Sequence, residues 1–320
     1  MIVPLLLLVV GLVLLIKGAD FLVDGAASAA KSLGISTFVI GLTVVAFGTS
    51  APEMAAAVQF SLAGEGGAVV GTVVGSNIAN ICLILGITAL VSPIPCASRV
   101  IRFEAPLMAL VTVLAGAVLL DGSLSRLDGA LLLAGIAVYV LRSALAKREI
   151  GHDVEEITEE EMSHHPTRKS LWRGLGIAFV GLIMLALGAK FLVDGVSDLA
   201  RALGVPEYII SLSIVAFGTS LPELVTSVQA ARKGHPEIAV ANVLGSNVFN
   251  LLAVLGLGAS VAPIAVPAGV LARDLWIMAA ATAACLPIML TGGRVTRLEG
   301  GLLALVYLGY AAVLLIHQTR

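Results

Sequence analysis

Charged side chains are scarce in this chain: only 12% of its 320 residues are Asp, Glu, Lys or Arg, whereas 58% are hydrophobic. A soluble globular domain carries about a quarter of charged residues. So many apolar side chains cannot all be buried in one core surrounded by water, and lipid must therefore surround much of the protein. The net charge of −2 argues against a nucleic-acid partner, which would require a basic surface.

Cysteines and catalytic motifs are scarce as well. The three cysteines, Cys82, Cys96 and Cys285, are scattered without the spacing of a metal site or a disulfide framework, and we interpret them as small apolar packing residues. The chain contains no His-Glu-x-x-His motif and no other complete catalytic set. We therefore expect neither enzymatic activity nor a cofactor, and no segment indicates an obligate protein partner.

The chain does contain a series of apolar runs long enough to cross a bilayer. A spanning helix needs about 20 mostly apolar residues. Ten stretches qualify: 2–23, 37–60, 68–92, 103–120, 127–146, 171–193, 207–230, 238–262, 268–290 and 300–317. They predict an all-α polytopic membrane protein with ten transmembrane helices.

One long polar stretch, residues 147–170, divides the runs into two sets of five, so we expect five-helix repeats at 1–146 and 171–320. With the N-terminus outside, thirteen loop Lys and Arg residues fall on the inner side and four on the outer side. Because cytoplasmic loops are enriched in Lys and Arg, this predicts a cell (inner) membrane protein with both termini outside. The linker is then cytoplasmic, and its acidic composition is typical of a solvated spacer.

The two sets of five spans are copies of one another. Residues 39–59 (VIGLTVVAFGTSAPEMAAAVQ) and 209–229 (IISLSIVAFGTSLPELVTSVQ) are identical at twelve of 21 positions. The same offset of 170 relates GSNIANI at 75–81 to GSNVFNL at 245–251. Because five is odd, the second copy enters the membrane from the opposite side. This predicts inverted repeats, which are typical of secondary transporters.

Each copy places one glutamate, Glu53 or Glu223, near the middle of an apolar span. A charge at that depth costs about 3 kcal/mol or more unless something compensates it. No Lys or Arg lies near the middle of a span to do so. The alternative is a protonated glutamate that hydrogen-bonds between helices, but two symmetry-related glutamates in one motif favour a transported cation.

A proline directly precedes each glutamate. Pro52 has no N–H, so the carbonyl of Gly48 loses its helical partner. A free carbonyl at membrane depth is tolerated only where it faces protein, water or an ion. Thr49 lies four residues before Glu53 and therefore on the same helix face. The second copy repeats this arrangement with Gly218, Thr219, Pro222 and Glu223.

The next span of each copy adds a serine and an asparagine that are also four residues apart, Ser76 with Asn80 and Ser246 with Asn250. Together with the carboxylates, hydroxyls and free carbonyls, they supply the hard oxygen ligands that suit Ca²⁺ and Na⁺. For these residues the alternative is interhelical hydrogen bonding by the asparagines.

The pair GTSAPE and GTSLPE, each followed at the same distance by GSNIAN or GSNVFN, resembles the two alpha-repeats of the cation/calcium antiporter superfamily. Within it, the chain is most similar to prokaryotic sodium/calcium exchangers, over nearly its whole length. The resemblance implies exchange of Na⁺ for Ca²⁺ by alternating access, with four ion sites at the repeat interface. It implies Glu53 and Glu223 as the central ligands. The remaining ligands that it implies are Thr49, Thr219, Ser50, Ser220, Ser76, Ser246, Asn80 and Asn250, with carbonyl oxygens from Ala46 and Ala216.

The position of Asn250 holds Asp in some members of the superfamily. Here it is Asn, like its counterpart Asn80, so two central carboxylates remain and match the charge of one Ca²⁺. This predicts transport that does not require K⁺. If three Na⁺ replace each Ca²⁺, as the resemblance implies, transport also moves net charge.

Other functions remain open from the sequence. The same fold could couple H⁺ or move another divalent cation, because two glutamates can carry protons. A passive cation channel is also compatible with inverted repeats and buried carboxylates. Glu104 and Asp274, a further acidic pair at the offset of 170, are expected at the membrane interface beside arginines.

Overall fold

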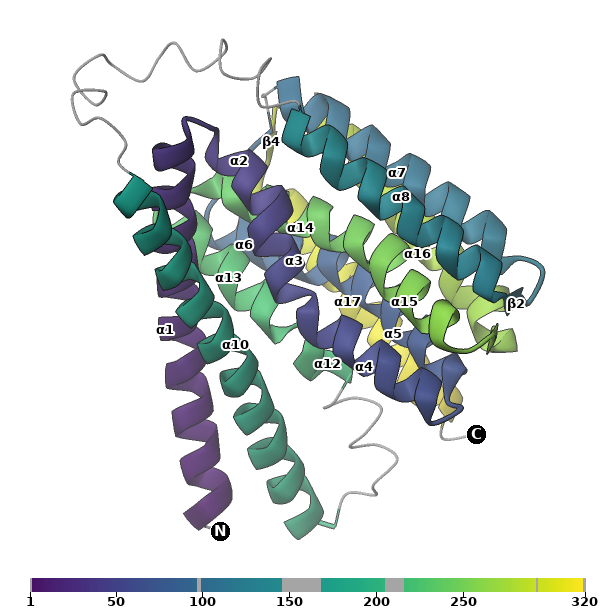
Figure 1. Ribbon diagram of the computed structural model, residues 1–320. Coiled ribbons are helices and arrows are strands. Elements are labelled where there is room, and N and C mark those ends of the chain that lie inside the picture. Colours follow the sequence, from purple (N-terminus) through teal and green to yellow (C-terminus); the bar gives the residue numbers. More distant parts are fainter. Residues whose placement is uncertain (1, 97–98, 146–167, 205–215, 292, 319–320) are drawn as a thin grey trace.

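A computed structural model describes residues 2–96, 99–145, 168–204, 216–291 and 293–318, which are almost entirely helical (Figure 1). Within these ranges, eight helices are long and apolar enough to cross a membrane, and they match eight of the expected spans. The expected span at 127–146 is the helix α8 (Arg126–Leu145). The expected span at 207–230 includes residues outside the described ranges, and its described part forms two short helices, α12 and α13.

The first repeat contains three long helices and two spans built from several segments, in which η denotes a π-helical turn. Its elements are α1 (Ile2–Leu33), α2 (Thr37–Ile40), η1 (Gly41–Val45), α3 (Ala46–Thr49), α4 (Ala51–Leu62), α5 (Gly66–Ile78), η2 (Ala79–Ile84), α6 (Leu85–Val91), β1 (Ile94–Pro95), α7 (Arg99–Leu119), β2 (Ser123–Leu124) and α8.

The described part of the second repeat follows the same order, with one additional π-helical turn, η6, before α16. Its elements are α10 (Arg168–Ala202), α12 (Ala216–Thr219), α13 (Leu221–Arg232), α14 (Pro236–Phe249), η5 (Asn250–Val254), α15 (Leu255–Val261), β3 (Ile264–Ala265), η6 (Val270–Asp274), α16 (Leu275–Thr291), β4 (Arg294–Val295) and α17 (Arg297–Gln318).

The helices α1 and α10 are longer than the spans expected at 2–23 and 171–193. An apolar run marks only the part of a helix that lies in lipid, whereas backbone hydrogen bonds continue through the polar residues beyond it. Gly34 ends the extension of α1, and Gly204 ends that of α10. Both have a positive φ, of 62° and 80°, which glycine adopts at no steric cost.

Small residues line the contact between α1 and α10, which run antiparallel (Figure 1). A Cβ atom added to Gly18 would lie 2.8 Å from the backbone nitrogen of Leu185 and 2.9 Å from the carbonyl oxygen of Gly181. Gly11 likewise faces Gly188 across the contact. The two backbones can approach this closely only because these positions lack side chains. We call this contact, formed by Gly11, Gly18, Gly25, Gly174, Gly181 and Gly188, the glycine seam.

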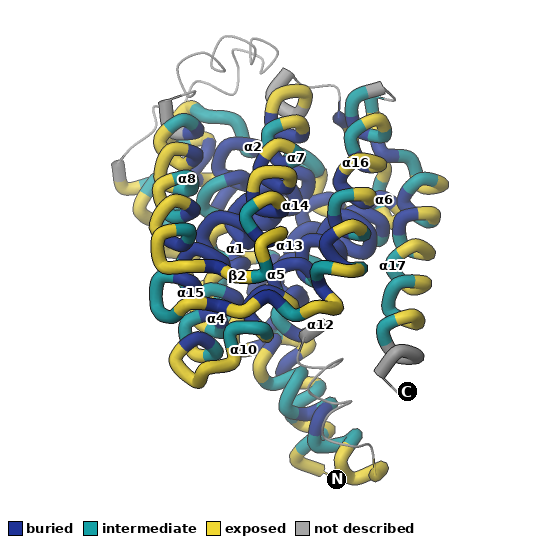
Figure 2. Tube along the Cα trace, turned by 90° about the vertical axis from the view of Figure 1, so that its right-hand side faces the viewer, coloured by how far each residue is buried: buried dark blue, intermediate teal, exposed yellow. Residues whose placement is uncertain are grey.

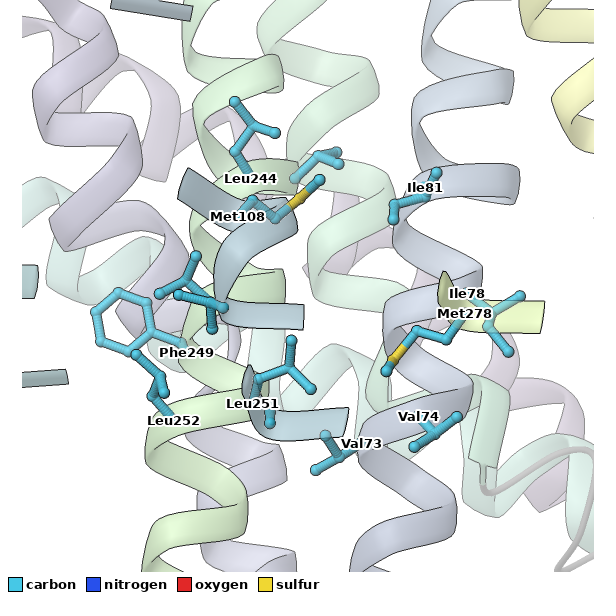
Figure 3. Packing of buried hydrophobic residues seen from close by; sticks show 14 of the residues in the cluster. Val73, Val74, Ile78, Ile81, Met108, Leu244, Phe249, Leu251, Leu252 and Met278 are labelled. Atoms are coloured by element: carbon cyan, nitrogen blue, oxygen red, sulfur yellow. The ribbon is translucent and has the colours of Figure 1, made fainter. Parts of the chain in front are cut away.

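The other helices pack around α5 and α14, which lie in the buried centre of the protein (Figure 2). Figure 3 shows Ile78 of α5 beside Met278, and Leu244 near Met108. Met108 and Met278, separated by the repeat offset, are both fully buried. Apolar side chains that face away from this core, including Leu114, Leu131 and Leu305, are more than half exposed, as expected of a surface that contacts lipid.

Four short strands join the repeats to each other. β1 pairs antiparallel with β4, where Ile94 lies opposite Val295. β2 pairs antiparallel with β3, where Leu124 lies opposite Ile264. In both pairs, one strand comes from each repeat.

Candidate ion-binding site

The expected helix interruptions occur in both copies of the GTSxPE motif. α3 ends at Thr49, and α4 begins one residue later with Pro52 in its first turn. Ser50 lies between them with φ −85° and ψ 1°. Ser220 separates α12 from α13 with nearly the same angles, −89° and 2°. The proline breaks the helical hydrogen-bond ladder directly before each glutamate, as the sequence predicts.

The two glutamates are buried at these interruptions. Glu53 is 1% exposed and Glu223 is 2% exposed. Neither carboxylate oxygen of Glu53 and only Oε1 of Glu223 has a hydrogen-bond partner within the described part of the chain. A buried carboxylate without a partner is costly in free energy, so a cation or a proton must compensate it.

Hydroxyl contacts link the two copies of the motif. The Ser50 hydroxyl donates to Oε1 of Glu223 at 3.4 Å, which joins the break of the first repeat to the carboxylate of the second. The hydroxyl oxygens of Ser76 and Ser220 lie 3.3 Å apart and again join the two repeats. The residues expected from two distant sequence motifs therefore meet in one buried place.

The expected asparagines lie beside this place, at the start of a π-helical turn in each repeat. Asn80 is in η2, and neither of its amide atoms has a partner among the described residues. Asn250 is in η5, and its Nδ2 donates to Oδ1 of Asn77 at 3.1 Å while its own Oδ1 is unpartnered there. The Ser246 hydroxyl is likewise buried and has no hydrogen-bond partner among the described residues. These side chains still have oxygen atoms with which to bind a cation.

The remaining expected ligands lie in the short helices that precede the two interruptions, α3 and α12. The carbonyl oxygen of Ala46 accepts from the backbone N–H of Ser50 at 3.1 Å and from the Thr49 hydroxyl at 3.4 Å. Thr219 is the last residue of α12, and Ala216 is the first. Thr49 is fully buried, whereas Thr219 is partly exposed.

Three asparagines that the sequence analysis did not single out belong to the same polar region. Nδ2 of Asn77 donates to the backbone oxygen of Asn247 at 3.3 Å, across the two repeats. Both residues lie in the repeated Gly-Ser-Asn triplet, and the same asparagine in both repeats could have indicated a role near the site. Asn242 accepts a hydrogen bond from the Thr49 hydroxyl at 3.1 Å, but its counterpart is Thr72, and no repeat signal marks it.

The arrangement suits a cation that prefers oxygen ligands. In the described part of the chain, no group of three or more His, Cys, Asp or Glu side chains could hold a metal ion. Among the described residues, the two glutamates would supply the negative charge for a cation bound here, with neutral hydroxyl, amide and carbonyl oxygens around them. Ca²⁺ and Na⁺ accept such mixed oxygen sets, whereas softer metals require His or Cys.

Glu104 and Asp274 lie outside this site. Both are more buried than expected of residues at the membrane interface, at 5% and 8% exposed. Arg142, from α8, donates to Glu104 at 2.8 Å and stacks over the ring of Phe103, whereas Asp274 pairs with Arg273 at 2.7 Å. Each of these acids is already neutralised by an arginine, so we do not assign them to cation binding.

Comparison with known proteins identifies close relatives. The family model described as "Sodium/calcium exchanger protein" matches residues 3–145 and 173–316. The putative antiporter CaxA of Alkalimonas amylolytica is 40% identical over 90% of this chain and 91% of its own length. The sodium/calcium exchanger MaX1 of Methanosarcina acetivorans is 33% identical over 90% and 91%, respectively. A structure of the sodium-calcium exchanger NCX_Mj superimposes with a TM-score of 0.85 and 29% identity over 97% of this chain and 98% of that one.

Proposed function

Because this chain belongs to the sodium/calcium exchanger family, we propose that it is a secondary antiporter that exchanges Na⁺ for Ca²⁺ across a cell membrane, with Glu53 and Glu223 as the central ligands. The observation that carries the proposal is the pair of buried carboxylates at the two helix interruptions, which together have one hydrogen-bonded oxygen within the described residues. Two negative charges in an apolar environment require a divalent cation or its equivalent.

The neutral oxygens around the carboxylates support the same assignment. Ca²⁺ takes six to eight oxygen ligands, so two glutamates cannot complete its coordination alone. Ser50, Ser76, Ser220, Ser246, Thr49, Thr219, Asn80 and Asn250 supply the further oxygens in this proposal, with the carbonyls of Ala46 and Ala216. The contacts from Ser50 to Glu223 and from Ser76 to Ser220 support ligand sets that draw on both repeats.

Alternating access follows if the two repeats are inverted copies within a ten-helix protein. The antiparallel glycine seam supports this arrangement, because it brings the same helix of each repeat together through the same small residues. The strand pairs β1–β4 and β2–β3 support it as well, since β3 corresponds to β1 at an offset of 170 and β4 corresponds to β2 at an offset of 171. Two halves related in this way can exchange conformations, which opens the site first to one side and then to the other.

We further propose that transport moves net charge, does not require K⁺, and occurs with both termini outside the cell. Asn80 and Asn250 add no charge beside the two glutamates, so bound Ca²⁺ is neutralised and no additional carboxylate remains for K⁺. The excess of Lys and Arg in the loops on the linker side supports the orientation.

The test is ⁴⁵Ca²⁺ uptake into proteoliposomes loaded with Na⁺, compared with loading with choline. Uptake that requires internal Na⁺ supports the exchanger. Equal uptake from choline-loaded vesicles under a pH gradient would identify H⁺ as the coupling ion instead. Uptake without any counter-ion gradient would indicate a passive channel and overturn the proposal.

A further inference from the structure

Asn242 is a fully buried residue of α14 that makes three hydrogen bonds around the candidate site. Its Oδ1 accepts from the Thr49 hydroxyl at 3.1 Å. Its Nδ2 donates to the Ser227 hydroxyl at 3.0 Å and to the backbone oxygen of Glu223 at 3.3 Å. The Glu223 backbone oxygen can only accept, so the amide nitrogen must face it and the amide orientation is determined. Asn242 therefore ties α3 of the first repeat to α13 of the second.

The residues that form this tie are present in one repeat only. At the offset of 170, Asn242 corresponds to Thr72 and Ser227 corresponds to Ala57. Threonine has no amide nitrogen, and alanine offers no hydroxyl, so the first repeat cannot build the same three bonds. The two otherwise similar halves therefore differ here in which side chains can connect the segments around the site.

The tie lies on one side of the glutamates. Ser227 follows Glu223 by four residues toward the end of α13, which is about 6 Å along the helix. Asn242 precedes Ser246 by the same number of residues, toward the beginning of α14. The tie therefore occupies the route from the carboxylates to the membrane face at which α13 ends and α14 begins. We call this face the Lys233 side, and the opposite face, where α4 ends, the Leu62 side.

The residues along the route to the Lys233 side, where the tie lies, are also more buried than their counterparts on the Leu62 side. On the Lys233 side, α14 is buried continuously from Ile238, and Ala241 is inaccessible. On the Leu62 side, the counterparts Ala68 and Gly71 of α5 are exposed. The Lys233 side is therefore closed in this conformation.

Ion pairs reinforce the closed side at its outer end. Lys233 contacts Asp24 at 2.8 Å and Asp20 at 3.1 Å, both on α1, and Gln229 donates to Asp20 at 2.6 Å. On the Leu62 side, Ala63 stands in place of Lys233, and Lys190 stands in place of Asp20. Lys190 instead pairs with Asp194 of its own helix at 2.8 Å.

We propose that Asn242 is a positioning residue that keeps the passage to the Lys233 side closed by holding Thr49 against α13 and α14. This inference rests on the proposed exchange function, in which the site must open to both sides in turn. Opening toward the Lys233 side breaks the bond from Thr49 to Asn242. Asn242 therefore stabilises the conformation in which the passage to the Lys233 side is closed.

The test measures access to each passage with single cysteines, after Cys82, Cys96 and Cys285 have been replaced by alanine. The reporters are Thr226→Cys on the Lys233 side and its counterpart Ala56→Cys on the Leu62 side, each three residues after a central glutamate. A membrane-impermeant thiol reagent is added to intact cells and to inside-out vesicles. In Asn242→Thr, labelling at position 226 should accelerate roughly three- to tenfold, the change in population expected from the loss of one buried hydrogen bond. Labelling at position 56 should slow.

Two further variants test whether the change in labelling depends on the bond between Asn242 and Thr49. Thr72→Asn makes the reciprocal exchange and should not accelerate labelling at position 226. Thr49→Val removes the same hydrogen bond from its other end and should reproduce the effect of Asn242→Thr, which also provides a test if the latter does not fold. Unchanged labelling in folded Asn242→Thr or Thr49→Val, or equal acceleration by Thr72→Asn, would overturn the proposal. The labelling requires no ion gradient, so it stands apart from ⁴⁵Ca²⁺ uptake, whose failure would overturn the exchange function instead.

Discussion

Neutralising either central glutamate should abolish Ca²⁺ exchange while leaving the protein folded. Glu53→Gln and Glu223→Gln keep the shape of the side chain, and each removes one of the two charges assigned to the ion in the proposed site. At about 4 Å and an effective dielectric constant of about 20, one unit charge interacts with a divalent ion by about 8 kcal/mol. If the regained hydration of the ion offsets half of this, about 4 kcal/mol is lost, which weakens Ca²⁺ binding about 10³-fold.

The assay is Na⁺-dependent ⁴⁵Ca²⁺ uptake into proteoliposomes, with elution volume and thermal unfolding in detergent as measures of folding. Glu104→Gln is the matched control, because Glu104 is also buried but is paired with Arg142 outside the site. That variant should lose stability and retain exchange. Near-normal exchange by Glu53→Gln or Glu223→Gln would refute the assignment of these carboxylates as central ligands.

Three further predictions concern the linker, the coupled charge and the glycine seam. Replacing residues 152–165 with a Gly/Ser linker should leave exchange intact, because the segment is polar and has no periodic apolar face; loss of uptake in a correctly inserted variant would reveal a regulatory element. Uptake should persist when an inert cation replaces K⁺ and should respond to a clamped membrane potential by about 2.3 kcal/mol per charge at 100 mV. A strict K⁺ requirement would contradict the role of Asn250, whereas indifference to the potential would contradict net charge movement. Gly18→Ala should lower stability in detergent by about 1–3 kcal/mol, because its Cβ would lie 2.8 Å from the backbone of Leu185. Gly176→Ala, which meets nothing within 4 Å, should not lower it, and equal melting temperatures of the two variants would contradict the steric argument.

The helix interruptions were predictable because their cause is local. Pro52 and Pro222 remove a donor from the helix wherever they occur, and the structure breaks the helices at Ser50 and Ser220 as expected. The repeat made the grouping of candidate ligands predictable as well, since the same motif in two copies indicates one shared place.

Features that depend on packing or on asymmetry were not predictable in this way. Asn242 acts through contacts with Thr49 of the other repeat and with Glu223 and Ser227 of another helix, and nothing in the sequence around it marks it. The burial of Glu104 was not predictable for the same reason, because its partner Arg142 lies on a different helix, α8. The apolar runs also underestimated the lengths of α1 and α10, because a helix that extends beyond the lipid keeps its backbone hydrogen bonds.

The glycine seam has a consequence for how the protein is made. α1 is synthesised first, but the face that carries Gly11, Gly18 and Gly25 finds its partner only when α10 has been made, after α8 and the linker. At ordinary rates of synthesis this delay is on the order of ten seconds. During that time, the small-residue face of α1 lies open in the bilayer, where close helix contact is the main source of association. A chain that stops after α8 keeps that face uncovered and available to a membrane helix of another protein.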